Sequence, residues 1–352
     1  MTFYGDFYMS DKLFYLCGMT PDTTGGIYGY ELDENNIPQQ KFHQPFCGCN
    51  LLCRSVDGKV LYSTCIIDGN GGVASFRIKA DGSLEYLNMV AANGKSTCYV
   101  ATAPGGKYLY AANYSSSNIS EFTLNSDGSI RELKRSIMFS GSGPDERQNM
   151  PHPHFTDFTP DGRQLMVIDL GTDEIRLFDF DPEAGLLNVE KPDVFKVEPA
   201  GSGPRHIIFN RAGNMAYLLN EIGNTVCVLD FADGKFTFRQ LVNTLPESVE
   251  IYSKASAIRL SADERFLFAS NRGYDSTAVF KILADGTLEL QDVVPSEGES
   301  PRDVNFLPGG EFFAMANEFS DNLSLFAYDK AAGKLTSCNF SLSLPRPLYI
   351  YY

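Results

Sequence analysis

The chain has 352 residues and a formal net charge of −15, from 44 acidic and 29 basic side chains. This charge argues against nucleic acid or an anionic membrane surface as a partner. No apolar run approaches the roughly 20 residues that a membrane-spanning helix needs. With 26 Phe and 18 Tyr the chain can build a large core, and we expect a soluble protein.

The opening residues, Met1–Asp6, contain no basic segment followed by an apolar one. We therefore expect no export signal and a cytoplasmic protein. Eight cysteines are spread through apparent strands, which favours reduced core residues over a disulfide framework. Cys47, Cys49 and Cys53 cluster, but this spacing lacks the second pair that a zinc site would need, and we expect these thiols to be structural.

In chain order, two apolar strand-like runs come first, Leu13–Cys17 and Gly26–Leu32, with a turn-rich loop between them. The second run has six later counterparts, which are Gly72–Ile78, Asn118–Leu124, Glu174–Phe180, Thr225–Phe231, Ser276–Ile282 and Asn322–Tyr328. Most are followed by a turn such as Asp-Gly and by another short apolar run, as in antiparallel hairpins. The chain therefore contains seven copies of one unit of four short strands.

Successive units start about 45 to 56 residues apart, close to the ~40 to 50 residues of a propeller blade. We predict an all-β fold, a seven-bladed β-propeller with four-stranded antiparallel blades, as a single domain over residues 1–352. The first unit has no clear innermost strand, whereas Pro345–Tyr351 reads as an innermost strand without a blade to follow it. The C-terminal strand is therefore predicted to join the N-terminal blade and close the ring.

The turn in the first hairpin of each unit provides a common frame. These turns fall at Asp57-Gly58, Gly105-Gly106, Asp161-Gly162, Ala212-Gly213, Asp263-Glu264 and Gly309-Gly310. Seven residues before the first residue of each turn stand Asn50, Cys98, His154, Arg205, Ser256 and Arg302. Eight and nine residues after the first turn residue stand Cys65-Ile66, Asn113-Tyr114, Asp169-Leu170, Asn220-Glu221, Asn271-Arg272 and Asn317-Glu318. Because the two strands are antiparallel, both sets should ring one mouth of the central channel.

The later units place many ionisable side chains in that ring. They are His154, Arg205, Glu221, Arg272, Arg302 and Glu318, with His152, His206 and Asp169 adjacent. Burying such charges is costly unless they are paired or used. Strand alternation predicts that His152 and His154 point to the same side. A Glu or His could activate water while an Arg stabilises an oxyanion or clamps a carboxylate or phosphate, so we expect a small anionic or carbonyl substrate.

Several other interpretations of these residues stay open. His154 could merely cap a loop, and Arg302 and Glu318 could form a structural ion pair across their own hairpin. His152, His154 and Asp169 could bind a metal, although His-x-His is a common pattern with only one carboxylate nearby. A noncatalytic propeller that binds a partner protein would instead need a broad apolar patch at the channel mouth, and the charged ring argues against it.

The chain also carries a set of short motifs. They are Gly141-Ser142-Gly143-Pro144, Arg147-Gln148, Pro151-His152-Pro153-His154, Gly203-Pro204-Arg205-His206, Leu219-Asn220-Glu221, Ser270-Asn271-Arg272-Gly273 and Pro301-Arg302-Asp303. Together they resemble the seven-bladed lactonase family, which includes the propeller-type 6-phosphogluconolactonases and the fungal carboxy-cis,cis-muconate cyclases. The resemblance extends from Tyr15-Leu16-Cys17-Gly18 to Pro345-Arg346-Pro347 and is weakest in the first two units, at Cys47-Gly48-Cys49-Asn50.

The resemblance implies lactone ring opening, or the reverse closure, without a cofactor. The residues that match the family's functional positions are His154 (less securely His152), Arg205, Glu221 and Arg272. We expect His152, His206, Arg302, Glu318, Arg147 and Asp169 to bind substrate, and we expect no metal. The leading hypothesis is a lactonase that hydrolyses 6-phospho-D-glucono-1,5-lactone in the oxidative pentose phosphate route.

In this hypothesis Glu221 and His154 share acid and base duty, and Arg205 polarises the lactone carbonyl. Arg272 or Arg302 grips a phosphate or carboxylate. A muconate-type lactonising cycloisomerase with the same fold is the alternative enzyme. The sequence leaves open which lactone is used and whether the protein is a monomer or a homodimer.

Overall fold

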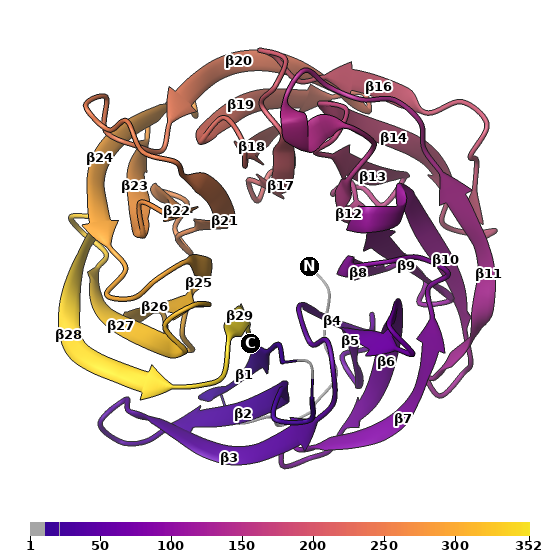
Figure 1. Ribbon diagram of the computed structural model, residues 1–352, viewed down its shortest axis with the longest axis horizontal. Coiled ribbons are helices and arrows are strands. Elements are labelled where there is room, and N and C mark those ends of the chain that lie inside the picture. Colours follow the sequence, from indigo (N-terminus) through magenta and orange to yellow (C-terminus); the bar gives the residue numbers. More distant parts are fainter. Residues whose placement is uncertain (1–10, 21) are drawn as a thin grey trace.

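Seven β-sheets surround a central channel in the computed structural model, which describes residues 11–20 and 22–352 (Figure 1). The opening segment Met1–Asp6, from which we expected no export signal, lies outside the described residues. In the described part of the chain the helices are two short 3-10 turns, η1 (Tyr114–Ser116) and η2 (Glu146–Gln148). None of the described helices is long and apolar enough to cross a membrane.

Each sheet is one blade, numbered here along the chain, with its strands given from the channel outward. Blade 1 consists of β29 (Pro347–Tyr351), β1 (Leu13–Gly18), β2 (Gly26–Leu32) and β3 (Pro38–Pro45). Blade 2 consists of β4 (Leu52–Arg54), β5 (Val60–Ile67), β6 (Asn70–Ile78) and β7 (Leu84–Ala91). Blade 3 consists of β8 (Thr97–Thr102), β9 (Tyr108–Asn113), β10 (Asn118–Leu124) and β11 (Ile130–Met138).

Blade 4 is the irregular one, because two short strands pair with β14. It consists of β12 (Pro153–Phe158), β13 (Gln164–Asp169), β14 (Glu174–Asp181), β15 (Leu186–Leu187) and β16 (Asp193–Lys196). Blade 5 consists of β17 (Pro204–Phe209), β18 (Met215–Asn220), β19 (Thr225–Ala232) and β20 (Lys235–Asn243). Blade 6 consists of β21 (Lys254–Leu260), β22 (Phe266–Arg272), β23 (Ser276–Ile282) and β24 (Leu288–Pro295). Blade 7 consists of β25 (Pro301–Phe306), β26 (Phe312–Asn317), β27 (Asn322–Asp329) and β28 (Lys334–Ser343).

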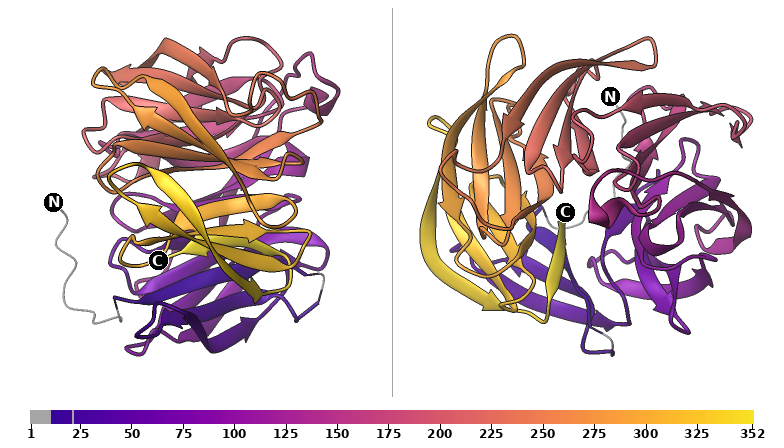
Figure 2. Two further views of the ribbon diagram at one scale, coloured as in Figure 1. Left: turned by 90° about the vertical axis from the view of Figure 1, so that its left-hand side faces the viewer. Right: turned by 45° about the horizontal axis from the view of Figure 1, so that its top comes forward.

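The ring closes as the sequence predicted. β29 is the innermost strand of blade 1 and pairs antiparallel with β1, with Leu16 opposite Ile350. In Figure 2 the yellow C-terminal strand lies against the indigo strands of the same blade. Both Leu16 and Ile350 are fully buried, so the two ends of the described chain share one core.

Adjacent blades are tied by a tyrosine that recurs in the second strand. Tyr15 donates its hydroxyl proton to Gly82 O at 2.9 Å, and Tyr62 does the same to Gly128 O at 2.8 Å. Each acceptor is the glycine of an Asp-Gly turn in the next blade, held at a φ of +77° or +82°. The positive φ favours glycine in these turns, and a Cβ on Gly82 would lie 2.1 Å from the terminal methyl group of Leu13, which would have to move.

Candidate active site

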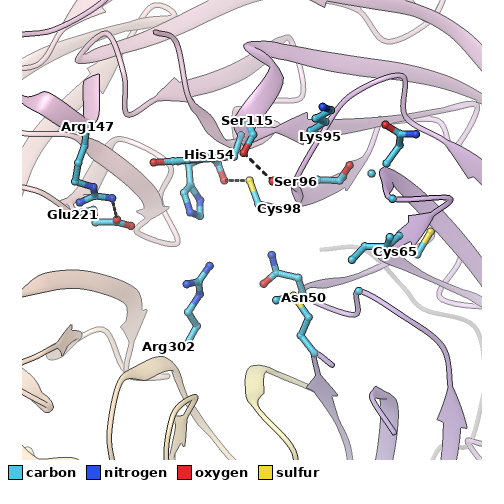
Figure 3. Close-up of a pocket in the computed structure, with 18 of the residues that line it drawn as sticks. Asn50, Cys65, Lys95, Ser96, Cys98, Ser115, Arg147, His154, Glu221 and Arg302 are labelled. Carbon is cyan, nitrogen blue, oxygen red and sulfur yellow. Dashed lines mark hydrogen bonds and ion pairs between the residues drawn. The ribbon is translucent and has the colours of Figure 1, made fainter. Parts of the chain in front are cut away.

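A cavity of about 630 Å³ opens at one mouth of the channel, and we call it the site cavity. One wall is charged, and the other, the neutral wall, is uncharged apart from Lys95, which lies beside Ser96 and Ser115 (Figure 3). The charged wall carries His154, Arg147, Glu221, Arg272, Arg302 and Lys254. The neutral wall comes mainly from blades 2 and 3 and carries Asn50, Cys65, Ile66, Asn70, Ser96, Cys98, Tyr114 and Ser115, together with glycines 48, 69 and 71.

The repeat frame explains which side chains reach this cavity. Four of the six residues that stand nine positions after the first turn residue line it, namely Ile66, Tyr114, Glu221 and Arg272. Most residues eight positions after the first turn residue instead point into their own blade, because alternate residues of a strand face opposite sides, although Cys65 lines the cavity. Asn220, for example, donates to Thr225 Oγ1 at 2.9 Å.

Asp169, which we expected to bind substrate, points into the interior of blade 4. Its carboxylate accepts the backbone N–H of His152 at 2.7 Å and of Gly171 at 3.0 Å, and it pairs with Arg176 at 2.6 Å. The side chain is fully buried and does not line the site cavity. Asp169 therefore holds the blade together at the place where blades 3 and 5 to 7 use asparagine.

Glu221 is the centre of the charged wall. Its carboxylate pairs with Arg272 at 2.8 Å and with Arg205 at 3.0 Å, and Arg147 contacts the other carboxylate oxygen (Figure 3). Burial alone would raise the pKa of Glu221, but the surrounding guanidiniums of Arg272 and Arg205 hold it well below its usual range. Glu221 is therefore an anion at neutral pH and a weak base.

His154 points into the site cavity towards Arg302 (Figure 3). Burial, and then the neighbouring Arg205, hold its pKa well below the usual value, so the imidazole is neutral at physiological pH. Its buried Nδ1 has no hydrogen-bond partner in the described part of the chain. The alternative in which His154 caps a loop through that nitrogen is thus not observed.

His152 and His154 do not lie on the same face, so the alternation argument was wrong here. The pairing of β12 with β13 shifts register between Pro153 and Phe155, which places a bulge at His154. The ring of His152 stacks on Tyr114 with centroids 4.3 Å apart, and its Nδ1 lies 2.8 Å from Tyr114 O. His152 therefore packs against Tyr114 and does not line the site cavity.

Arg205, which we expected at the substrate carbonyl, lies behind the charged wall. Its Nε donates to Glu221, and its Nη1 contacts Ser256 O and lies 3.2 Å from the ring nitrogens of His206. Arg205 does not line the site cavity. Burial and then Arg272 lower its pKa to about 9, which leaves it cationic at neutral pH. The geometry makes Arg205 a support for Glu221.

His206 lies deeper in the channel than the site cavity. Its ring is 5.2 Å from that of His154, and it lines a separate cavity of about 330 Å³ with Tyr99, Asp157 and Arg259. Burial and then Arg205 hold the pKa of His206 well below its usual value. The structure therefore does not place His206 where it was expected, in contact with substrate in the site cavity.

Arg302 and Glu318 form the ion pair that we considered as an alternative, with 3.5 Å between Nη1 and Oε2. Glu318 also pairs with Arg346 at 2.5 Å and does not line the site cavity. Arg302 does line it, and its side chain is 22% exposed. Of this pair only Arg302 is available to a ligand.

Sequence analysis missed the network that positions Arg147. η2 begins with a capping box, in which Asp145 accepts Arg147 N and Gln148 reaches back to Asp145 N. Gln148 also donates to Asp173 at 2.8 Å. Asp173 accepts the backbone N–H groups of Gly201 and Gly203 at 2.7 Å. One buried carboxylate thus joins the loop of Arg147 to the loop that leads into Arg205.

Neither a reactive thiol nor a metal cluster is found in the described residues around the cavity. Burial raises the pKa of Cys98 to about 12, and its thiol contacts the carbonyl oxygens of Pro153 and His154 at 3.6 Å (Figure 3). The described part of the chain contains no group of three His, Cys, Asp or Glu side chains arranged to hold a metal ion. The proposed His152, His154 and Asp169 ligand set is therefore not assembled.

Comparisons with known proteins agree with this architecture. The sequence profile of the family "Lactonase, 7-bladed beta-propeller" matches residues 13–352. The chain is 33% identical over 350 residues to the 6-phosphogluconolactonase of Bacillus subtilis strain 168, covering 98% of this chain and 99% of that protein.

Two solved structures share the whole fold. One is a protein of Bacteroides fragilis NCTC 9343 provisionally named a 6-phosphogluconolactonase, with a TM-score of 0.89, 34% identity and coverage of 97% and 98% of the two chains. The other is the periplasmic gluconolactonase PpgL of Pseudomonas aeruginosa, with a TM-score of 0.88, 28% identity and coverage of 96% and 98%. The chain belongs to the lactonase family of seven-bladed β-propellers, and this membership supports the hydrolysis of a sugar lactone.

Proposed function

We propose that this protein hydrolyses 6-phospho-D-glucono-1,5-lactone to 6-phosphogluconate, in the cytoplasm and as a step of the oxidative pentose phosphate route. The observation that carries the proposal is the reversal of charge in the site cavity. The whole chain has a net charge of −15, yet five cationic side chains and one carboxylate line the cavity. Such a local excess of cations attracts an anionic substrate into an otherwise negative protein.

The two walls suggest how such a substrate would lie. Arg302, Arg272 and Lys254 offer cationic groups for a phosphate, and arginine can bind it through two parallel hydrogen bonds. The opposite wall offers Asn50, Asn70 and several hydroxyl groups, which suit the hydroxyls of a sugar. A polyol lactone with one anionic group matches both walls.

The chemistry follows from the protonation states. Neutral His154 accepts a proton from a water molecule while the oxygen of that water adds to the carbonyl carbon of the lactone. The bond from that carbon to the ring oxygen then breaks, and the imidazolium returns the proton to the ring oxygen, which leaves a carboxylic acid and a free hydroxyl group. Glu221 keeps Arg272 and Arg147 in place and favours the imidazolium that forms transiently.

The test compares lactone opening by purified protein on phosphorylated and unphosphorylated gluconolactone, with a muconate-type lactone as a third substrate. The proposal predicts the highest kcat/KM for the phosphorylated sugar and a loss of that preference in Arg302→Gln. Arg163→Gln, on the turn of blade 4 outside the site cavity, is the matched control. Equal rates on both sugars would overturn the phosphate assignment, and activity confined to the muconate-type lactone would favour the cycloisomerase.

A further inference from the structure

Tyr114 is a phenol on the neutral wall of the site cavity, where its ring contacts that of His154. It follows β9 directly and opens η1. In the repeat frame it occupies the same slot as Glu221 and Arg272, nine residues after the first-hairpin turn. The propeller therefore presents its side chain to the channel mouth in the same way as those two residues.

The ring of Tyr114 is fixed on two sides. It stacks on His152 at 4.3 Å, and it meets His154 edge to face at 5.6 Å. Its backbone N–H donates to Ser96 O at 3.1 Å, and its carbonyl oxygen lies 2.8 Å from His152 Nδ1. These contacts fix the position of the hydroxyl group relative to His154.

The hydroxyl group is a neutral donor with no competing acceptor. Burial, and then the nearby Glu221, raise the pKa of Tyr114, so the phenol keeps its proton at physiological pH. Arg147 interacts with the phenol oxygen and favours negative charge there, which polarises the O–H bond. Within the described residues the hydroxyl donates to no protein atom, so its proton is available to a ligand in the site cavity.

From this geometry we propose that Tyr114 is a catalytic residue that donates a hydrogen bond to the carbonyl oxygen of the lactone. The inference rests on the proposed function. As water adds to the carbonyl carbon, negative charge develops on that oxygen, and a fixed donor stabilises it more in the transition state than in the bound substrate. The phenol proton stays on Tyr114 throughout, because His154 carries the only proton that is transferred.

Tyr114 thereby takes the role at the lactone carbonyl that was first expected of Arg205. Arg205 was expected at the carbonyl, but its Nε donates to Glu221 and its Nη1 to Ser256 O, and it does not line the site cavity. Both oxygens of Glu221 are likewise occupied by guanidiniums. Among the uncharged groups of the cavity, Tyr114 is the donor that lies against the ring of the proposed base.

The test is Tyr114→Phe, which keeps the ring that stacks on His152 and removes only the hydroxyl group. We expect kcat for lactone hydrolysis to fall about 100-fold while KM changes less than about threefold, as for the loss of one oxyanion donor. Incorporation of p-aminophenylalanine at position 114 restores an N–H donor on the same ring and should recover about tenfold of the loss. Tyr217→Phe, which removes a tyrosine hydroxyl bonded to Gly286 O far from the cavity, is the control.

The outcomes separate the two proposals. If wild-type protein opens the lactone and Tyr114→Phe keeps more than about half of its kcat, the role of Tyr114 is overturned and the proposed function stands. The role is also overturned if p-aminophenylalanine gives no more activity than phenylalanine. If the wild-type protein opens no lactone faster than the buffer does, the proposed function fails and the role of Tyr114 fails with it.

Discussion

At the scale of single residues, charge pairing decides which groups can exchange protons. Glu221 and His154 looked equivalent as bases in the sequence, but the structure separates them. Three guanidiniums contact the carboxylate of Glu221, whereas the buried ring of His154 stays neutral. Counting residues from the turns could place both side chains at the channel mouth, but it could not show the contacts between blades that set their pKa values.

The pH dependence of activity tests this separation. Because burial and Arg205 hold the pKa of His154 below its usual value of about 6.5, the neutral base persists to lower pH than an exposed histidine would allow. We expect kcat/KM to be flat from about pH 8 to about pH 6.5 and to fall only at more acidic pH. The measurement is a pH–rate profile corrected for spontaneous opening. An acidic limb of the pH–rate profile with its midpoint well above pH 6.5 would contradict the assignment of His154 as the base.

Asp157, in the deeper cavity, gives a prediction for stability. Burial raises its pKa to about 6, from the ordinary value of 3.8, so the folded state disfavours its carboxylate. The stabilisation by the protonated group is complete below about pH 3.8 and is lost as the pH rises through about 6. Asp157→Asn should therefore increase the free energy of unfolding by about 1–2 kcal/mol near pH 7.5.

The same Asp157→Asn substitution should have little effect near pH 4.5, because there the native carboxyl is already largely protonated. Asparagine can still accept the Phe158 N–H, which bonds Asp157 at 2.8 Å. Thermal melts at the two pH values measure the difference. An equal gain at both would show that the effect does not come from titration of Asp157.

At the scale of elements, the strands and most turns could be predicted because their signals are local. Asp-Gly turns need glycine at positive φ, and the middle strands are continuously apolar. The bulge at His154 and the helical turn η2 were missed although both are local, since the bulge lies within the hairpin of β12 and β13 and η2 begins with a capping box of Asp145 and Gln148. These two features determine which histidine and which arginine enter the site cavity.

Asp173 tests whether the connection between two loops matters for the site. In Asp173→Ala the amides of Gly201 and Gly203 and the side chain of Gln148 lose a buried acceptor. We expect a loss of about 2–4 kcal/mol in the free energy of unfolding and a drop in kcat, because Arg147 and Arg205 are no longer fixed.

The matched control is Asp181→Ala in the same blade. Asp181 also accepts two backbone N–H groups, at 2.9 and 3.0 Å, but it is exposed to solvent. We expect Asp181→Ala to lower the free energy of unfolding by less than about 1 kcal/mol, since water can replace the lost acceptor. Equal losses in the two variants, by denaturant melts and lactone assays, would show that the buried Asp173 connection has no special importance.

At the scale of the whole molecule, ring closure joins the two ends of the chain through β29. Ile350 packs in the core between blades 1 and 7, Leu348 is also buried, and Asp303 of blade 7 accepts the Ile350 N–H at 2.8 Å. Removing residues 347–352 would expose β1 as an open edge. The truncated protein should lose cooperative unfolding or precipitate, whereas the full-length Tyr352→Ser variant should not. A truncated protein with the wild-type melting temperature would contradict this account of closure.

The most direct test of the central claim is lactone opening by the wild-type protein and by Glu221→Gln, measured together. The substitution removes the charge that holds three arginines while it keeps the shape of the side chain. We expect wild-type protein to open 6-phospho-D-glucono-1,5-lactone far faster than buffer does, and Glu221→Gln to lose about 100-fold or more in kcat/KM while remaining folded. Wild-type activity in Glu221→Gln, or no activity in either protein, would contradict this expectation.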